Sequence, residues 1–331
     1  MLPLPAFEWV SPGSLDELVR ALGESPGESL LLAGGTDLLP NMKHGLFAPR
    51  RVIGLRRVRE LRGIAETPAG GLVIGGGAPL DRVATDPRVM ARYPALARAA
   101  GLVASPQIRR MGTIGGNLCL ETRCVYYNQT AFWRGALGGC LKKDGPTCFV
   151  VPQGRRCVAA MSADTPAPLI AYGASVELVS VRGTRTLPVA KLFAGDGVKN
   201  NVRAADEVLT KVELPPPAER LFSAYEKVRS RAAIDFPLLS IAAAAVLDAG
   251  GHVVELTVVV GALGALPRVV RGLEITRAAP LSREAIDLVA EAAHTQCNPL
   301  SSLGAEDWRK DIVAPVVRRA LAGLAPSRIA G

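Results

Sequence analysis

Histidine is scarce in this sequence, aromatic residues make up only 5%, and no long apolar run is present. The 3 histidines, His44, His252 and His294, lie far apart, and none falls within the cysteine-rich segment 124–157. A zinc site of mixed Cys and His ligands is therefore poorly supported. Because a membrane helix needs about 20 consecutive apolar residues, we expect no membrane span. The N-terminal residues show no signal peptide, so we expect a cytoplasmic protein, in which disulfides are rare.

Several nucleotide and hydrolase motifs are also missing. The chain has no GxGxxG segment and no GxxxxGK[ST] segment. These absences argue against a nicotinamide-dinucleotide fold and against a P-loop nucleotidase. No Ser/His/Asp or Cys/His arrangement is legible for hydrolytic or acyl chemistry. We therefore expect a chain that carries electrons and holds no catalytic residue of its own.

The chain is basic, with a formal net charge of +9 and a pI near 9.5. Its densest basic stretch runs from Arg50 to Arg62 and contains 6 arginines. Three interpretations are open: a solvated face, a contact with a partner subunit, and nucleic-acid binding. The last is disfavoured because no aromatic residues stand between the arginines, so we expect no nucleic-acid partner.

The remaining composition is that of a globular protein. The 331 residues are 49% hydrophobic and 21% charged, which suggests two or three domains. Ser14 with Glu17 predicts the capped start of a helix, and Arg182-Gly183 predicts a β-hairpin turn. Three prolines at 215–217 predict a domain boundary. We expect an α+β or mixed α/β fold in three pieces: 1–54, 55–217 and 218–331.

Two glycine loops are candidates for phosphate binding: "LLAGGTDLLP" and "MGTIGGNLC". Each places two glycines beside a threonine, Thr36 or Thr113, and the second adds Asn117. Glycines let the backbone approach a ligand closely and turn its N–H groups toward an anion, and threonine adds a hydroxyl donor. The alternative is that both are ordinary tight turns between a strand and a helix. The residues alone leave both interpretations open.

Four of the 6 cysteines fall in one irregular segment, with the spacing C-x15-C-x7-C-x8-C: Cys124, Cys140, Cys148 and Cys157. The segment has no CxxC pair, which a zinc ribbon would normally show. A [4Fe–4S] cluster tolerates irregular spacing and is favoured by nearby glycines and apolar shielding, both of which are present. A cluster is the favoured interpretation, and zinc or unmetallated thiols stay open.

Two cysteines stand apart from this set. Cys119 follows the glycine loop directly, so we assign it to that loop and exclude it from the metal ligands. Cys297 lies at the end of a predicted helix and is expected to be a packed free thiol.

Five segments together resemble the flavoprotein subunit of the molybdenum hydroxylase family, to which xanthine dehydrogenase and aerobic carbon monoxide dehydrogenase belong. In chain order they are "LLLAGGTDLLPNMK", "RRMGTIGGNLC", "SADTPAPLIAYGASVEL", "YEKVRSRAAIDFPLLSIAAA" and "WRKDIVAPVVRRAL". The resemblance covers nearly the whole chain. It implies a two-part α/β FAD-binding domain of the vanillyl-alcohol-oxidase and CO-dehydrogenase-flavoprotein type. A C-terminal α+β domain with a small antiparallel sheet and helices would follow.

The resemblance also implies an FAD site. The two glycine loops would embrace the pyrophosphate, Asp164 would bind polar parts of the flavin, and Lys227 would lie near the isoalloxazine or the phosphate. Without the resemblance, Asp164 is an ordinary turn residue and Lys227 a solvated strand lysine. The implied cofactor-binding residues are Leu32, Ala33, Gly34, Gly35, Thr36, Asp37, Leu38, Val103, Thr113, Ile114, Gly115, Gly116, Asn117, Asp164, Leu209 (packed against the ring) and Lys227.

The cysteine segment reads as an insertion at about 120–160. Compact family members join the GGN loop to the Asp-containing segment by a short turn, whereas 46 residues separate Asn117 from Asp164 here. A similar insertion with a [4Fe–4S] cluster marks one family branch, the β subunit of 4-hydroxybenzoyl-CoA reductase. That resemblance implies Cys124, Cys140, Cys148 and Cys157 as cluster ligands beside FAD.

The same resemblance implies partners and a reaction. Electrons from ferredoxin would pass through the cluster and FAD to a [2Fe–2S] small subunit and a molybdopterin-binding large subunit, in a dimer of heterotrimers. The reaction would be reductive removal of the phenolic hydroxyl of 4-hydroxybenzoyl-CoA, which gives benzoyl-CoA. Two alternatives stay open: the FAD subunit of a molybdenum hydroxylase that oxidises its substrate, and a basic zinc-binding interaction module.

Overall fold

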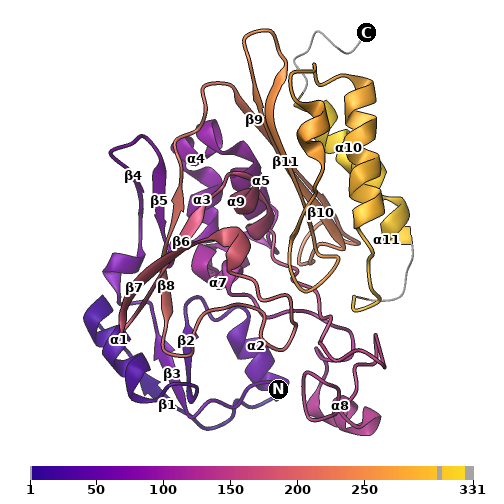
Figure 1. The fold of residues 1–331 in the computed structure, drawn as a ribbon. Coiled ribbons are helices and arrows are strands. Elements are labelled where there is room, and N and C mark those ends of the chain that lie inside the picture. The colour runs from indigo at the N-terminus through magenta and orange to yellow at the C-terminus, as the bar shows by residue number, and fades with distance from the viewer. Residues whose placement is uncertain (1, 304–307, 325–331) are drawn as a thin grey trace.

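The computed structural model describes residues 2–303 and 308–324, which form three β-sheets in succession along the chain (Figure 1). Residues 304–307, which the sequence assigns to a helix with the residues that follow them, lie outside the described residues, as do residues 1 and 325–331. The predicted α+β class is confirmed, because helices and sheets alternate first and an antiparallel sheet with helices follows. No helix in the described part of the chain has the length and apolar character needed to cross a membrane.

The first sheet is small and parallel, in the order β1-β3-β2. Helix α1 (Leu15–Glu24) crosses between its strands and begins as predicted, since the Ser14 hydroxyl accepts a hydrogen bond from the Glu17 amide at 3.2 Å. Its apolar face packs on the sheet. The other elements are β1 (Glu8–Val10), β2 (Ser29–Leu32), α2 (Leu38–Lys43) and β3 (Arg51–Gly54).

The second sheet has five antiparallel strands in the order β4-β5-β8-β6-β7. The predicted hairpin is present, since Ser180 pairs with Gly183 across the β6–β7 turn. The strands are β4 (Ile64–Glu66), β5 (Leu72–Gly75), β6 (Ser175–Ser180), β7 (Gly183–Pro188) and β8 (Val208–Leu214). The helices are α3 (Leu80–Thr85), α4 (Pro87–Arg92), α5 (Pro94–Gly101), α6 (Pro106–Met111), α7 (Ile114–Leu118), α8 (Ala131–Leu137) and α9 (Pro166–Ala171).

The third sheet is antiparallel, in the order β12-β11-β10-β9, and both of its faces are covered. Helices α5 and α9 contact one face and α12 the other, as Figure 1 shows. Successive side chains of β10 therefore enter two different cores: Ala242 and Ala244 face the middle segment, while Ile241 and Ala243 face the C-terminal helices. The elements are β9 (Leu221–Val228), β10 (Leu239–Leu247), β11 (Val253–Gly261), β12 (Arg268–Val269), α10 (Arg283–Gln296), α11 (Trp308–Asp311) and α12 (Val313–Ala322).

The cysteine-bearing segment leaves the fold through a narrow neck. Arg123 and Ala160 exchange two backbone hydrogen bonds of 2.8 Å, which close the segment as a loop between α7 and α9. Between these two residues only α8 is a regular helix, and Figure 1 shows it at the edge of the molecule, apart from the sheets. That this segment is an insertion relative to compact family members stays a prediction.

Candidate functional site

The two glycine loops, 33–38 and 112–117, meet through their backbones. A β-carbon on Gly34 would lie 1.9 Å from the carbonyl oxygen of Met111, a distance that no side chain tolerates. The first loop connects β2 to α2, and the second connects α6 to α7. Glycine at position 34 is therefore needed for the approach of one loop to the other, whatever else it contacts.

A third glycine segment, Gly75–Gly77, packs against the second loop. The amide of Gly115 donates to the carbonyl of Gly76 at 2.9 Å, and a β-carbon on Gly115 would come within 2.7 Å of that oxygen. Gly76 in turn lies against the carbonyl of Leu209 in β8. The sequence shows the Gly75–Gly77 triplet after a strand, but nothing in its composition indicated that it carries the neighbouring loop.

The second loop exposes glycine backbone at the surface. Thr113 is the N-cap of α7, and its hydroxyl accepts from the Gly116 amide at 3.1 Å. Gly116 is exposed between buried neighbours, and apart from the Thr113 hydroxyl its α-carbon faces open space. Thr36 of the first loop is exposed too. Exposed glycine backbone at Gly116 and the exposed Thr36 hydroxyl, on two touching loops, leave room for an anionic ligand such as a pyrophosphate to approach closely.

Asp164 and Lys227 are buried against each other. The Lys227 ammonium lies 3.0 Å from the Asp164 carboxylate, and their side chains are 1% and 3% exposed. The Tyr225 hydroxyl donates to the same carboxylate at 2.7 Å. Burial raises the pKa of Asp164 and lowers that of Lys227, and the attraction between them opposes both shifts. Lys227 is thus not the solvated strand lysine that the residues alone would suggest.

This buried pair is tied to the second loop and to the Val103 segment. The Asn117 side-chain oxygen accepts from the Thr165 amide at 3.1 Å and hydroxyl at 2.6 Å, which holds the residue next to Asp164. The Lys227 ammonium also donates to the carbonyl of Leu102 at 3.0 Å. Asn117, Asp164, Lys227 and the Leu102 backbone, next to Val103 in the chain, therefore form one connected region with the second glycine loop.

The other residues of the implied cofactor-binding set differ in how deeply they are buried. Ile114 and Leu209 are buried in the core of the middle segment, at 0% and 6% exposure. Gly35 adopts a left-handed conformation at φ 72°, which favours glycine. The half-buried members of the set are Leu32, Ala33, Gly34, Gly35, Asp37, Leu38 and Val103.

The four clustered cysteines line one pocket, although 32 residues separate the first from the last. Their exposures are 9%, 8%, 6% and 7% in chain order, and all four are free thiols. Tyr126, Tyr127, Phe149 and Val150 give the pocket apolar walls. The space at its centre is small, about 10 Å³. Across the described residues, no three His, Cys, Asp or Glu side chains are grouped so that they could hold a metal ion.

The surroundings of the Cys124 and Cys157 thiols disfavour the charged thiolate form. Burial raises the pKa of the Cys157 thiol to about 11 and raises that of Cys124, while hydrogen bonds from backbone amides oppose both shifts. Gly197 lies directly against Cys157, since a β-carbon there would be 2.6 Å from the sulfur. Although the thiols are not grouped as metal ligands in this arrangement, their donor type, four sulfurs behind apolar walls, is the one that iron–sulfur clusters use.

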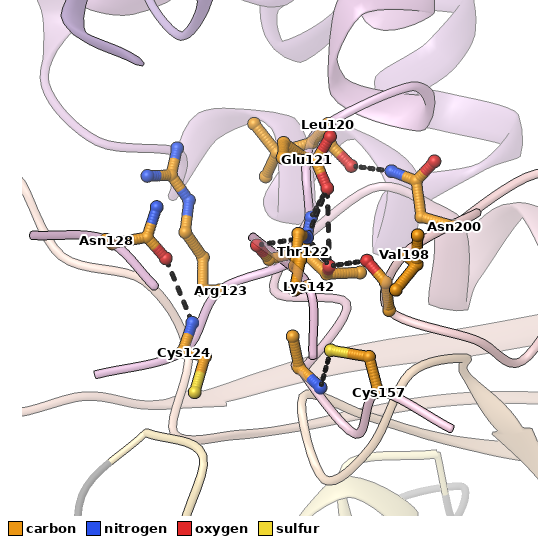
Figure 2. A network of polar contacts seen from close by, with 12 residues as sticks. Leu120, Glu121, Thr122, Arg123, Cys124, Asn128, Lys142, Cys157, Val198 and Asn200 are labelled. Carbon is orange, nitrogen blue, oxygen red and sulfur yellow. Dashed lines mark hydrogen bonds and ion pairs between the residues drawn. The ribbon is translucent and has the colours of Figure 1, made fainter. Parts of the chain in front are cut away.

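One cation lines this pocket. Lys142, whose side chain is 4% exposed, pairs with Glu121 and donates to the hydroxyl and carbonyl of Thr122 (Figure 2). Its ammonium lies 4.3 Å from the centre of the Tyr127 ring. Lys142 is therefore buried, whereas Arg155 and Arg156, two other basic residues of the insertion, are exposed.

Two arginines of the insertion hold both ends of α2. Arg123 pairs with Asp37, the residue before the helix, and stacks 4.5 Å from the centre of the Phe236 ring. The buried Arg134 donates to the carbonyls of His44 and Gly45, just past the helix, at 3.1 Å each. The insertion thus contacts the helix that follows the first glycine loop.

The sequence did not identify either arginine, because Arg123 and Asp37 are 86 residues apart and Arg134 and His44 are 90 apart. Burial of Asp37 raises its pKa, and the charge of Arg123 opposes that shift.

Two aromatic residues of the cysteine segment, Phe132 and Trp133, could have shielded the thiols from water, but they do not line the pocket. Phe132 is 87% exposed and Trp133 40%. Their side chains lie on α8, which projects outward. Cys119 is not among the pocket residues, and Cys297 is buried in the C-terminal core.

Residues 5–217 match the family described as "FAD binding domain in molybdopterin dehydrogenase". The chain is 30% identical over 325 residues to the carbon monoxide dehydrogenase medium chain of Hydrogenophaga pseudoflava, covering 97% of each protein. It is 28% identical over 311 residues to the putative xanthine dehydrogenase FAD-binding subunit of Escherichia coli K12, covering 93% of this chain and 92% of that one.

The fold agrees with these relatives. A solved carbon monoxide dehydrogenase from Hydrogenophaga pseudoflava, in a form that lacks the Mo-pyranopterin moiety of its cofactor, superposes with a TM-score of 0.80 at 28% identity. The superposition covers 97% of this chain and 98% of that one. The chain belongs to the molybdenum hydroxylase family, as an FAD-binding subunit of the xanthine and carbon monoxide dehydrogenase type.

Proposed function

We propose that this chain carries both FAD and a [4Fe–4S] cluster in a molybdenum enzyme of the 4-hydroxybenzoyl-CoA reductase type. The observation that carries the proposal is the single buried pocket lined by Cys124, Cys140, Cys148 and Cys157. A plain FAD-binding subunit needs no such pocket. Its place in an insertion beside the FAD loops indicates an additional electron relay on a flavoprotein scaffold.

The thiols would hold the cluster as thiolates, after their side chains reorient within the pocket. A cluster asks for four sulfur ligands, apolar shielding and backbone amides near the sulfurs. The pocket offers four buried thiols, two tyrosines and a phenylalanine. A four-cysteine zinc ribbon would normally carry CxxC pairs, which are missing here. When bound, the cluster supplies a one-electron relay at low potential.

The FAD would lie over the two glycine loops. The exposed Gly116 and Thr36 would meet the pyrophosphate, and Thr113 fixes the Gly116 amide in place. Asp164 and Lys227 would face the flavin as a paired acid and base, and Lys227 would supply positive charge near the ring. When bound, FAD supplies a carrier that accepts one or two electrons.

The proposal includes partners and a location. The molybdopterin would lie on a large subunit and the [2Fe–2S] centres on a small subunit, in a cytoplasmic dimer of heterotrimers. Reduced ferredoxin would be the electron donor. The substrate, 4-hydroxybenzoyl-CoA, would lose its phenolic hydroxyl and become benzoyl-CoA. Reductive attack on an aromatic ring needs strongly reducing electrons, which explains why an additional low-potential centre is useful.

The proposal also divides the chain into three domains, which would be the segments 1–54, 55–217 and 218–331.

A second function is favoured by the relatives. The carbon monoxide dehydrogenase and xanthine dehydrogenase chains, at 30% and 28% identity, bear the names of oxidising enzymes. In that case the cluster would be an outlet for electrons instead of an inlet.

The deciding experiment is turnover of the purified complex. We expect reduced ferredoxin and 4-hydroxybenzoyl-CoA to give benzoyl-CoA, measured by chromatography of the thioesters under anaerobic conditions. Oxidised ferredoxin is the matched control and should give no product. Reduction of the flavin by xanthine or carbon monoxide, with no turnover of the thioester, would replace the reductase with an oxidising molybdenum hydroxylase.

A further inference from the structure

The pocket of four thiols contains one positively charged group, the ammonium of Lys142. We propose that Lys142 is a positioning residue that fixes a positive charge beside the cluster and so raises its reduction potential. This inference rests on the proposed function, because it presumes a cluster on the four thiols. It assigns a role to a side chain that no motif indicated.

The surroundings of Lys142 fix its position. Its side chain is 4% exposed, and it reaches from the insertion back to the Glu121–Thr122 segment, as Figure 2 shows. The Glu121 carboxylate and the Thr122 hydroxyl lie in direct contact with the ammonium, and the Thr122 carbonyl lies at 3.3 Å. The Tyr127 ring closes a fourth side at 4.3 Å. The amine therefore has little freedom to leave the pocket.

The same contacts match the three donors of an ammonium group. The Thr122 hydroxyl donates its hydrogen to the carbonyl of Gly197 at 2.9 Å, so it accepts from Lys142. Carboxylate, hydroxyl oxygen and carbonyl are then three acceptors around one nitrogen. An ammonium supplies three N–H donors, whereas a neutral amine supplies two and leaves one acceptor facing a lone pair. The aromatic face of Tyr127 also favours a cation.

A buried charge at this place acts on the cluster more than a surface charge does. Reduction adds one negative charge to the cluster and its thiolates, and a nearby cation stabilises that reduced form. Charges in a poorly solvated pocket interact over several ångströms with little screening. Arg155 and Arg156 are exposed, so water and salt screen their effect. Lys142 is the basic residue that lines the pocket.

Glu121, the ion-pair partner of Lys142, should act on the reduction potential of the cluster in the opposite direction. Glu121 places a carboxylate on the far side of the ammonium, and its side chain is 19% exposed. Removing the lysine charge should lower the potential, whereas removing the carboxylate charge should raise it. A residue that only held the loop together would not give opposite signs for the two substitutions. The pair also follows the FAD loop in sequence, since Glu121 comes four residues after Asn117.

The test compares three variants of the holo complex: Lys142→Met, Glu121→Gln and Lys143→Met. The last is the matched control, because Lys143 is partly exposed, is not a pocket residue and lies near Asp144 at 3.7 Å. The readout is the midpoint potential of the cluster, from anaerobic titration with dithionite followed by electron paramagnetic resonance. Iron content is measured in parallel.

We expect Lys142→Met to shift the reduction equilibrium at least tenfold toward the oxidised cluster, which is 59 mV for a one-electron couple. Glu121→Gln should shift it the other way, and Lys143→Met should leave it within that margin. Equal potentials in all variants, or shifts of the same sign in the first two, would overturn the inference. If Lys142→Met assembles no cluster, Glu121→Gln decides alone: a raised potential supports the role, and any other result refutes it. A wild-type complex with no iron beyond that of the partners' [2Fe–2S] centres would instead refute the proposed function.

Discussion

The glycine loops and the cysteine insertion contact the same short helix, α2, but they are built in opposite ways. The glycine loops come together through backbone, because Gly34 and Gly115 allow contacts that a β-carbon would block. The insertion is held by buried charged side chains: Arg123 and Arg134 at the two ends of α2, and Lys142 at the thiol pocket. The glycine loops depend on the absence of side chains, whereas the insertion depends on the charge of its side chains.

This difference would let the proposed cluster-binding loop be added to a flavin scaffold. The insertion leaves through the Arg123–Ala160 neck, so the strands and helices around it keep their order. Arg123 of the insertion pairs with Asp37 of the first glycine loop, and Arg134 donates to the carbonyls just past α2. Metal binding and support of α2 are therefore assigned to different residues, and the two properties should separate on mutation.

The largest effect is expected for the metal. Cys140→Ser should reduce iron from about four atoms per chain to nearly none, because a cluster needs all four thiolates. FAD should stay bound, since Arg123 and Arg134 are unchanged. Metal analysis and flavin absorbance of the purified complex measure both. Cys119→Ser is the matched control and should keep its iron, because Cys119 is not a pocket residue. Loss of FAD together with iron in Cys140→Ser would show that the two sites are not separable.

The reverse separation is expected at the second glycine loop. Gly116→Val should abolish FAD binding while iron is retained, because the branched side chain would fill the open space above the loop. Gly135→Ala adds a methyl group to α8 of the insertion, where nothing lies within 4 Å, and should change neither cofactor. Flavin fluorescence after heat release, with iron measured on the same sample, checks the result. Full FAD content in Gly116→Val would refute the pyrophosphate assignment.

A substitution at the contact between the loops should cost stability as well as FAD. Gly34→Ala places a methyl group on the Met111 carbonyl, so the loops must separate. Substitutions that destabilise a fold commonly cost about 0.5–3 kcal/mol, and a backbone collision belongs at the upper end. Thermal unfolding followed by circular dichroism should show a lower Tm, and bound FAD should fall. An unchanged Tm would mean that the loops do not depend on this contact.

The smallest effect is expected at the far end of α2. Arg134→Met leaves the carbonyls of His44 and Gly45 without their charged donor, and a hydrogen bond to a charged group contributes about 1.5–3 kcal/mol. FAD should bind several-fold more weakly, because α2 carries the first glycine loop, while the four thiols are untouched. Arg134→Lys should restore part of the affinity. Fluorescence titration with FAD measures the change, and wild-type affinity in Arg134→Met would show that the insertion does not support the flavin loop.

The two regions also differ in how much of their structure could be predicted from the sequence alone. The glycine loops, the Ser14 cap and the β6–β7 hairpin depend on neighbouring residues, so short patterns predicted them. The convergence of Cys124 and Cys157 on one pocket was expected from the insertion as a whole. The contacts of Arg123, Arg134 and Lys142 were not predictable, because their partners are 20 to 90 residues away. A charged residue in an irregular segment gives no periodic signal of its burial.

The central claim is that one chain carries a flavin and an iron–sulfur cluster. The most direct test is the iron, acid-labile sulfide, zinc and FAD content of the complex, purified anaerobically and expressed per copy of this chain after subtraction of the partners' [2Fe–2S] iron. The account predicts one FAD with about four iron and four sulfide, and no zinc. One FAD with stoichiometric zinc, or with free thiols and no additional iron, would contradict it.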